Sequence, residues 1–524
     1  MTAKTQDRPA VASLRRRLPD APDAFSLYAH LSERGTRPGA MYYERADTPT
    51  IIVDSVAARI ETRGQTATLE ALSPGGERVL AQAARRLKDF VTQSEPRRLV
   101  LEFPAPEGDD AEARMLAASP FDALRAVTLN LGEGSDAAGD IICAGVIAYD
   151  FIDAFEDLPT PKSDPLNYPD NLFWLAESYV RIDPGAEARA VAMAFGGDDP
   201  EDSERAHYDA RELLADLTER CAEAKLLTPQ SVTPGAPPPA ATDLDDDGYA
   251  AQVDILKERI LAGDIYQIVP SRSFTAPCAD PFAAFTRLRA LNPSPIMFFI
   301  PGGDHVLFGA TPEPAVLVRR DGDDLTAEVR PIAGTRARGA TPDEDDRLEA
   351  DMRLDEKELA EHMMLVDLGR NDIARISEPG TRRVTKLLTV ERYSHVMHLV
   401  SRVEGKMRAG LDCLHAAVAC LNAGTLTGAP KLRAMQILRE AEATKRGPYG
   451  GSVGWIGGDG VIDTGIVIRS AYVKDGMATV RAGAGVVYDS DPVEEARETS
   501  RKAAGALAAI ADVHGRNARE GEGL

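Results

Sequence analysis

The chain has 524 residues, 44% of them hydrophobic, and a formal net charge of −23 from 60 basic and 83 acidic residues. This length and apolar fraction are enough for a sizeable core. The strong negative charge argues against a nucleic-acid-binding protein, because phosphate contacts require a basic surface. No apolar run approaches the roughly 20 residues that a membrane-spanning helix needs. We therefore expect a soluble, cytoplasmic protein with no nucleic-acid and no membrane partner.

The cysteines and the N-terminus add two exclusions. The five cysteines are scattered and odd in number, and none lies in a CxxC pair. A zinc knuckle or a disulfide framework is therefore not expected, and buried thiols in a reducing compartment explain them. The N-terminal stretch has basic residues with no apolar segment behind them, so it does not predict a secretory signal.

The predicted elements fall on both sides of a proline- and aspartate-rich stretch, residues 226–248, which we interpret as a linker or a long surface loop. Before it, alternating apolar stretches and one helical pattern predict strands at 49–64, 97–106, 141–152 and 188–197, and a helix at 204–225. After it, the same reasoning predicts helices at 249–263, 346–369, 411–422, 428–443 and 492–513, and strands at 264–274, 296–303, 305–320, 450–458, 462–476 and 477–489. Helices and strands do not alternate strictly, which favours an α+β fold over a doubly wound sheet or a βα barrel.

Two pairs of glutamates occur at the start of predicted apolar helices. Glu358 and Glu361 share one helical face, as do Glu495 and Glu498, because residues three apart lie together on a helix. Each pair fits a solvated first turn, where the helix dipole favours acids. Together they also fit two walls of a divalent-cation site, since Mg²⁺ prefers carboxylate and water ligands. Spacing alone leaves both interpretations open.

Three further motifs carry residues that have both a structural and a chemical interpretation. Gly483 and Gly485 end a strand, where they fit either a bulge or backbone amides that donate to a carboxylate. In "GTLTGAP", helix-start preferences explain Gly428, but they do not require Thr425. His398 lies in an apolar alternating stretch, where a histidine is more often a core residue than a catalytic one.

Six ordered motifs together carry a family resemblance. They are "PIAGTRARG", "ELAEHMMLVDLGRND", "YSHVMHLVSRVEG", "GTLTGAPKLRAMQI", "DTGIVIRSA" and "AGAGVVYDSDPVEEARETSRKA". The chain resembles the chorismate-utilising enzymes, and most closely their anthranilate synthase component I branch, strongly from about residue 248 to 510 and more weakly upstream. The resemblance implies an α+β fold of two packed antiparallel β-sheets flanked by helices. It also implies an N-terminal, regulatory-like region over 1–240 that ends in the linker, and a chorismate-binding catalytic domain over 245–515.

The resemblance implies a magnesium site built from the two glutamate pairs. Members of the family bind chorismate with Mg²⁺ bridging its ring carboxylate to acidic side chains. Carried onto this chain, Glu361 and Glu498 are the direct ligands, and Glu358 and Glu495 hold the waters of the metal. A dianionic substrate beside four carboxylates requires a divalent cation to offset their repulsion.

The resemblance also assigns residues that bind the two carboxylates of the substrate. Arg469 and Tyr449 are implied to hold the enolpyruvyl carboxylate, Arg469 through a charge-assisted hydrogen bond. Gly483, Gly485 and Lys502 are implied to help fix the ring carboxylate.

Five positions are implied to determine the chemistry. Glu313 in "ATPEP" matches a general acid for the departing ring hydroxyl. His398 and Thr425 match positions linked to the later elimination of pyruvate. Gln267 stands where water-using relatives have a lysine base, so ammonia is the expected nucleophile. Ala333 stands where the para-aminating enzymes have a nucleophilic lysine, which leaves direct attack at C2 of chorismate.

The implied function is that of an anthranilate synthase large subunit, a lyase of tryptophan biosynthesis that converts chorismate and ammonia into anthranilate and pyruvate. The alternative is a 2-amino-2-deoxyisochorismate synthase, which does not eliminate pyruvate. We find no glutaminase-type cysteine with its histidine and acid partners, so we expect a separate glutamine amidotransferase subunit, component II, in a hetero-oligomer. A catalytically silent binding protein is disfavoured, because all the carried-over positions are filled.

The chain departs from the family pattern where anthranilate synthases commonly bind tryptophan through a Leu-Leu-Glu-Ser motif. The matching stretch "MYYERAD" keeps the glutamate and has arginine in the serine position. The expected effector positions are Glu44, Arg45, Pro293 and Met297. Ile296 and Gly465 also stand where tyrosine and cysteine are frequent. We expect weakened or absent feedback by tryptophan, because a bulky cation can fill the pocket of the amino acid.

Overall fold

The structure is a computed structural model that describes residues 11–19, 21–108, 110–197, 199–227, 240–392 and 396–521. Most of the predicted linker falls on 228–239 and lies outside the described residues. Two long antiparallel strands, β3 (Thr50–Arg63) and β8 (Asn171–Ile182), pair along their whole length. Three register shifts between Val53 and Ala58 interrupt this pairing, and such bulges bend a strand. The two halves of the β3–β8 ribbon therefore belong to two different sheets.

The first sheet extends from the half of the ribbon that contains Thr50. Its antiparallel order is β1–β9–β8–β3–β2–β13–β14–β23–β24–β12–β10. The remaining strands of this sheet are β1 (Val11–Leu18), β2 (Tyr42–Arg45), β9 (Ala188–Phe195), β10 (Ala241–Thr242), β12 (Ser271–Pro277), β13 (Ile296–Pro301), β14 (His305–Thr311), β23 (Ser470–Lys474) and β24 (Met477–Gly483).

The second sheet extends from the other half of the ribbon. Its antiparallel order is β5–β6–β4–β3–β8–β7–β21–β22–β15–β16–β19, and β17 and β18 also pair with β19. Its strands are β4 (Thr66–Ala71), β5 (Val91–Glu95), β6 (Arg98–Glu102), β7 (Ile142–Ile147), β15 (Pro314–Asp321), β16 (Asp324–Val329), β17 (Ile332–Ala337), β18 (Arg383–Arg392), β19 (Val396–Lys406), β21 (Ser452–Gly457) and β22 (Ile462–Ile466). A separate pair joins β11 (Gln267–Ile268) to β20 (Gly428–Ala429).

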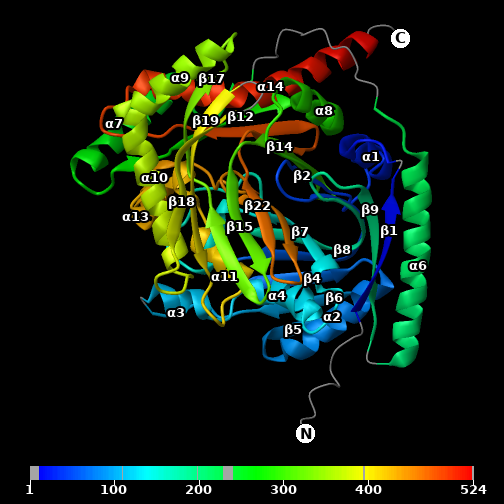
Figure 1. Ribbon diagram of the computed structural model, residues 1–524. Helices are drawn as coiled ribbons and strands as arrows, with labels where there is room; N and C mark the ends of the chain where they lie inside the picture. Colours follow the sequence, from blue (N-terminus) through cyan, green and yellow to red (C-terminus); the bar gives the residue numbers. More distant parts are fainter. Residues whose placement is uncertain are drawn as a thin grey trace.

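Helices cover the outer faces of this β-structure (Figure 1). In the picture α6 runs down the right side, alongside β1 and β9, and α14 crosses the top, where it packs on α7, α8 and β24. The α-helices are α1 (Ala24–Leu31), α2 (Pro74–Arg86), α3 (Ala111–Leu116), α4 (Phe121–Val127), α5 (Leu129–Gly132), α6 (Pro200–Glu223), α7 (Asp246–Leu261), α8 (Pro281–Leu291), α9 (Pro342–Leu354), α10 (Glu356–Ala374), α11 (Cys413–Cys420), α12 (Gly424–Thr427), α13 (Lys431–Ala441) and α14 (Pro492–Gly521). Short 3₁₀ turns are η1 (Lys88–Phe90), η2 (Ala138–Asp140) and η3 (Tyr149–Ala154).

Side-chain alternation along β13 separates the two main apolar cores. Ile296, Phe298 and Ile300 point into the core that also holds side chains of β7, β8 and β21, so this core fills the space between the sheets. Met297 and Phe299 point the other way, into the core under α1, α8 and α14. A strand that is buried on both faces reads as a continuous apolar run, which explains the "IMFFIP" pattern.

The α+β fold with antiparallel sheets is confirmed, and each predicted strand segment contains observed strand residues. Strands from both predicted regions occur in each sheet, since β2 pairs with β13 and β7 pairs with β21. The division into 1–240 and 245–515 remains a prediction about domains. In the described part of the chain, no helix is both long enough and apolar enough to cross a membrane.

One predicted helix, 346–369, is two helices in the structure. Helix α9 ends at Leu354 and α10 begins at Glu356, because Asp355 between them has an extended backbone. The Asp355 carboxylate accepts a hydrogen bond from the Glu358 N–H, at 3.1 Å. An aspartate that competes with the helix in this way is typical of a helix start.

A buried ion pair joins the two sheets. Arg45 on β2 donates to Asp463 on β22, with 2.7 Å between Nη1 and Oδ1, and both side chains are only 1% exposed. Tyr43 and Thr48 donate hydrogen bonds to the same carboxylate. Because water is excluded, each charge of this pair depends on its partner.

We predict that Asp463→Leu lowers the free energy of unfolding by about 3–5 kcal/mol. The variant leaves Arg45 buried, with the half-exposed Asp47 as its remaining acidic partner. Adding Arg45→Met restores most of the loss. The control Asp343→Ala breaks an exposed pair with Arg347 and costs less than about 1 kcal/mol. Urea unfolding measures all three variants, and a single Asp463 variant as stable as the control contradicts the prediction.

Candidate active site

Arg469, between β22 and β23, is the centre of the candidate site. Its side chain is half-buried, and no described residue forms a hydrogen bond or an ion pair with its guanidinium. Burial lowers its pKa, while Tyr449, Glu498 and Glu313 act in the opposite direction. A buried, unpaired guanidinium is unfavourable unless an anion joins it, and its flat fork matches a carboxylate.

The backbone holds Arg469 in an uncommon conformation. Its φ of 51° lies in the left-handed region, which costs a residue with a side chain on the order of 1 kcal/mol. The Ala310 N–H donates to its carbonyl at 3.2 Å, which ties this turn to the end of β14. Such strain is typical of a position where the direction of a side chain matters.

Glu313, between β14 and β15, is a buried carboxyl that faces Arg469 and Lys502. Thr425 of α12 donates a hydrogen bond to its Oε1 at 2.7 Å. Burial raises the pKa of Glu313 to about 7, although the Thr425 hydrogen bond and the two cations act in the opposite direction. A carboxyl with this pKa can donate a proton near neutral pH.

Lys502 links α14 to the end of β24. Its ammonium donates to the Gly483 carbonyl at 3.0 Å and pairs with Glu498 at 2.7 Å. Burial alone would raise the pKa of Glu498, but Lys502, and further Arg501 and Arg469, hold it below its ordinary value. The Glu498 carboxylate is therefore ionised next to the unpaired Arg469.

Two of the predicted glycines leave room for neighbouring side chains of the site. A Cβ at Gly483 would lie 2.5 Å from the Pro270 carbonyl oxygen and 3.1 Å from the Tyr449 hydroxyl, and a Cβ at Gly485 would lie 3.0 Å from Nε2 of Gln267. The Gln267 Oε1 is buried without a hydrogen-bond partner among the described residues. Burial raises the pKa of Tyr449 to about 12, so its hydroxyl stays protonated and can donate.

The other predicted residues lie on β17, β19 and α10. Ala333 and His398 occupy the paired strands β17 and β19, and burial lowers the pKa of His398, so its ring is neutral at pH 7. A Cβ at Gly334 would lie 2.5 Å from Oε2 of Glu358, so this glycine gives the carboxylate its space. His398 also faces Arg469, which connects this side of the site to its centre.

The four predicted metal ligands lie on two helices, Glu358 and Glu361 on α10 and Glu495 and Glu498 on α14. Arg336 pairs with one oxygen of Glu358, whose other oxygen is buried without a donor in the described chain. A cation or its water would satisfy that oxygen, and a carboxylate set is what Mg²⁺ prefers, so the residues fit this ion chemically. Among the described residues, however, no three acidic, histidine or cysteine side chains are already gathered as a metal site.

A family model described as chorismate binding enzyme matches residues 76–508. The chain belongs to this chorismate-binding enzyme family. Its site residues from Gln267 to Lys502 all fall inside the matched range.

Several relatives in this family are similar over most of the chain. Anthranilate synthase component 1 of Vibrio parahaemolyticus is 44% identical over 478 residues, which cover 90% of this chain and 86% of that protein. The pyocyanine-specific anthranilate synthase component 1 of Pseudomonas aeruginosa is 45% identical over 475 residues, covering 89% and 88%. The crystal structure of anthranilate synthase component I from Streptococcus pneumoniae superposes with a TM-score of 0.66, at 30% identity over 88% of this chain and 92% of that chain.

The four predicted effector positions line one pocket of this family member, a cavity of about 410 Å³ next to the β2–β13 pair. They are Glu44, Arg45, Pro293 and Met297. Glu44 pairs with Arg289 at 2.5 Å, while the Arg45 guanidinium turns to Asp463. Ile296 and Gly465, the two other positions that depart from the family pattern, lie against each other. A Cβ at Gly465 would lie 2.9 Å from Cδ1 of Ile296, so the glycine leaves space for the isoleucine.

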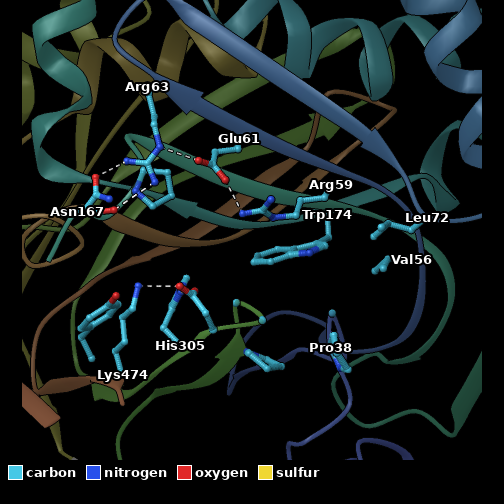
Figure 2. Close-up of a pocket in the computed structure, with 17 residues that line it drawn as sticks. Pro38, Val56, Arg59, Glu61, Arg63, Leu72, Asn167, Trp174, His305 and Lys474 are labelled. Carbon is cyan, nitrogen blue, oxygen red and sulfur yellow. Dashed lines mark hydrogen bonds and ion pairs between the residues drawn. The ribbon is translucent and has the colours of Figure 1, made fainter. Parts of the chain in front are cut away.

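A larger cavity of about 500 Å³ lies elsewhere, beside β3, β8 and the β13–β14 hairpin (Figure 2). In it, Arg59 and Arg63 both donate to Glu61, and Lys474 pairs with Asp304 at 2.6 Å. Its cations are therefore paired with acids on its own walls. No predicted site residue lines this cavity.

Sequence reasoning missed the ionic groups beneath the site. Glu442 is buried and pairs with two buried arginines, Arg446 and Arg481. The spacing of Glu442 and Arg446, four residues apart, was an available signal. It was weak, because such pairs are usually solvated and both residues follow the end of α13.

We predict that Thr425→Val raises the pKa of Glu313 above about 7, because the lost hydrogen bond stabilises the ionised carboxylate. Infrared difference spectra recorded at a series of pH values measure the pKa of Glu313. The band of its protonated carboxyl is identified as the one that is missing in Glu313→Gln. The control Thr286→Val removes a hydroxyl on α8 whose one hydrogen bond in the described part of the chain goes to the Phe282 carbonyl, and leaves the titration unchanged. A Thr425 variant that titrates like the wild type contradicts the assignment.

Proposed function

We propose that this chain is the large subunit of an anthranilate synthase, a lyase that converts chorismate and ammonia into anthranilate and pyruvate. The observation that carries the proposal is the half-buried Arg469, which pairs with no described residue, beside the protonatable Glu313. When a substrate carboxylate binds Arg469, the ring hydroxyl of the substrate comes within reach of the Glu313 proton. The names of the relatives, anthranilate synthase component 1, support the same activity.

In the first step, the nitrogen of ammonia bonds to C2 of chorismate, the ring double bonds shift, and the C–O bond of the ring hydroxyl breaks so that water leaves. The new ammonium group then loses one proton to become an amine. Glu313 donates the proton that this hydroxyl needs, and Thr425 orients the carboxyl. Gln267 occupies the position where water-using relatives have a lysine base. Its amide cannot deprotonate water, so ammonia is favoured as the nucleophile. Arg469 with Tyr449, and Lys502 with the β24 glycines, hold the two substrate carboxylates.

In the second step, the C2 proton leaves, the bond between the ring and the enolpyruvyl oxygen breaks, and the enolpyruvyl group takes up a proton to become pyruvate. The ring becomes aromatic as anthranilate. The neutral His398 and Thr425 are the residues we assign to this elimination. The alternative, release of 2-amino-2-deoxyisochorismate before elimination, is disfavoured because both residues are present.

We further propose Mg²⁺ as the cofactor, held by Glu361 and Glu498, with Glu358 and Glu495 bonded to its waters. When bound, the ion would neutralise the ring carboxylate against the four glutamates. The buried, unpartnered oxygen of Glu358 and the ionised Glu498 support this donor set.

A glutamine amidotransferase subunit, component 2, is the proposed source of ammonia. The component 1 naming of the relatives supports such a partner. We also propose weakened feedback by tryptophan. Arg45 stands in the serine position on the wall of the effector pocket, and its guanidinium does not fill the pocket but pairs with Asp463, so it offers no serine-like hydroxyl to an amino acid.

We predict that the protein, given chorismate, Mg²⁺ and ammonium, forms a product with blue anthranilate fluorescence and pyruvate in equal amounts. Glu498→Gln reduces the rate at least about 100-fold or raises the Mg²⁺ requirement, because it removes a charged ligand. The control Glu494→Gln, one turn earlier on α14 and exposed, leaves both unchanged.

Three outcomes contradict parts of this proposal. Chorismate that survives with enzyme, Mg²⁺ and ammonium overturns the activity. Consumption without fluorescence, with 2-amino-2-deoxyisochorismate found by mass spectrometry, selects the alternative product. Wild-type Mg²⁺ dependence in Glu498→Gln removes this residue as a ligand.

A further inference from the structure

Four segments that carry site residues meet at one buried ionic cluster, which we call the Glu442 cluster: Glu442, Arg446 and Arg481. Their exposed fractions are 7%, 2% and 7%. Glu442 pairs with Arg446 at 2.6 Å and with Arg481 at 2.9 Å. One acid and two cations, withdrawn from water, are costly unless every donor is used.

Arg446 uses its remaining donors on two separate backbone segments. Nη1 donates to the Leu426 carbonyl at 2.6 Å, and Nη2 donates to the Val269 carbonyl at 2.7 Å. Leu426 directly follows Thr425 on α12, and Val269 lies two residues after Gln267. One guanidinium therefore fixes the separation between these two parts of the site.

The same guanidinium also lies against two tyrosine rings. Its centre is 4.5 Å from the ring centroid of Tyr149 and 5.8 Å from that of Tyr449. The Tyr149 hydroxyl is 3.1 Å from Oγ1 of Thr427, which holds the far end of α12. The Tyr449 segment and α12 therefore rest on one cation.

The fourth segment is β24, which leads to Gly483 and Gly485. Arg481 on this strand donates to Glu442, and Ser271 donates from its backbone N–H and its hydroxyl to Oε1 of the same carboxylate, at 2.9 and 2.8 Å. Arg481 also donates to the Ser271 hydroxyl at 2.8 Å. The cluster thus extends from α12 to the strand that ends at Gly483.

We propose that Arg446 is a positioning residue of the active site, which sets the place of Thr425 relative to Gln267 and Tyr449 without touching substrate. This inference rests on the proposed function for its kinetic consequence, but not for its structural one. A lysine cannot replace Arg446, because a single ammonium cannot bridge a carboxylate and two divergent carbonyls in one plane.

The position of Thr425 can be monitored through Glu313, to which it donates its hydrogen bond. The charged groups that face Glu313 are Lys502 and Arg469, and neither belongs to the Glu442 cluster. If α12 shifts, the carboxylate loses the donor that stabilises its ionised form, so Glu313 keeps its proton to higher pH. Because the protonated form of Glu313 is the active acid, the alkaline limb of the plot of kcat against pH moves to higher pH.

The test is Arg446→Lys in the full-length protein, compared with the matched control Arg220→Lys. Arg220 likewise joins a carboxylate, Asp54, to a carbonyl, that of Leu31, far from the site. We expect Arg446→Lys to lower kcat about 100-fold, which is the cost of a misplacement of about 1 Å, with a smaller change in KM. It also moves the alkaline limb of the kcat profile and the infrared titration of Glu313 to higher pH. Arg220→Lys leaves all of these at wild-type values.

A double variant separates positioning from general loss of stability. If Arg446 acts through Thr425, Arg446→Lys adds no further shift of the limb when Thr425→Val is already present. Tyr149→Phe removes only the hydroxyl that contacts Thr427. We expect it to shift the alkaline limb to higher pH by a smaller amount than Arg446→Lys does, and it replaces Arg446→Lys as the test if that variant does not fold.

The inference and the proposed function can fail separately. If the wild-type protein makes no anthranilate, the function fails, while the infrared titration of Glu313 in Arg446→Lys still decides the positioning role. If Thr425→Val moves this titration and neither Arg446→Lys nor Tyr149→Phe does, the positioning role is wrong. Equal kinetics of the Arg446 and Arg220 variants also overturn it.

Discussion

The arrangement of the site depends on one unpaired charge. Arg469 is held in a left-handed turn, half-buried, with no partner for its guanidinium among the described residues. The nearby acids of the site do not neutralise this charge. Glu498 is taken by Lys502, Glu358 by Arg336, and Glu313 is kept near its protonated form by burial. The site is thus built to receive an anion, and a substrate with two carboxylates meets this requirement.

The fold explains how residues from distant parts of the chain reach this charge. The two sheets share the β3–β8 ribbon, and the turn that carries Arg469 follows β22, the strand that Asp463 joins to β2 across the core. The Ile466 N–H on this strand also donates to the Glu313 carbonyl at 2.9 Å. The N-terminal region is therefore joined through a continuous set of contacts to Glu313, the residue we propose as the acid, although it supplies none of the residues we assign to catalysis.

Local patterns predicted many of the individual elements, because apolar alternation directly reflects which face of a strand is buried. They missed others, among them β8, α2 and α8. They could not predict that β3 and β8 belong to both sheets, since bulges and long-range pairing leave no mark in local periodicity. They also joined α9 and α10, because a single aspartate in an acidic helical pattern does not look like a break.

For the site, spacing suggested the two glutamate pairs and motif order suggested the family, which the comparisons establish. Three features needed coordinates. The unpaired state of Arg469, the burial that raises the pKa of Glu313 and the Glu442 cluster all depend on which distant side chains are excluded or included. Burial and pairing are properties of the packed chain, so an arginine in a loop looks the same in the sequence whether it binds substrate, as we propose for Arg469, or supports the site, as we propose for Arg446.

The most direct measurement is a crystal structure of Glu313→Gln, which lacks the proposed acid, grown with chorismate and Mg²⁺. The account predicts a substrate carboxylate paired with the Arg469 guanidinium at hydrogen-bonding distance, with the ring hydroxyl next to residue 313. Chorismate bound elsewhere, or bound with the Arg469 guanidinium still without an anion, would contradict it.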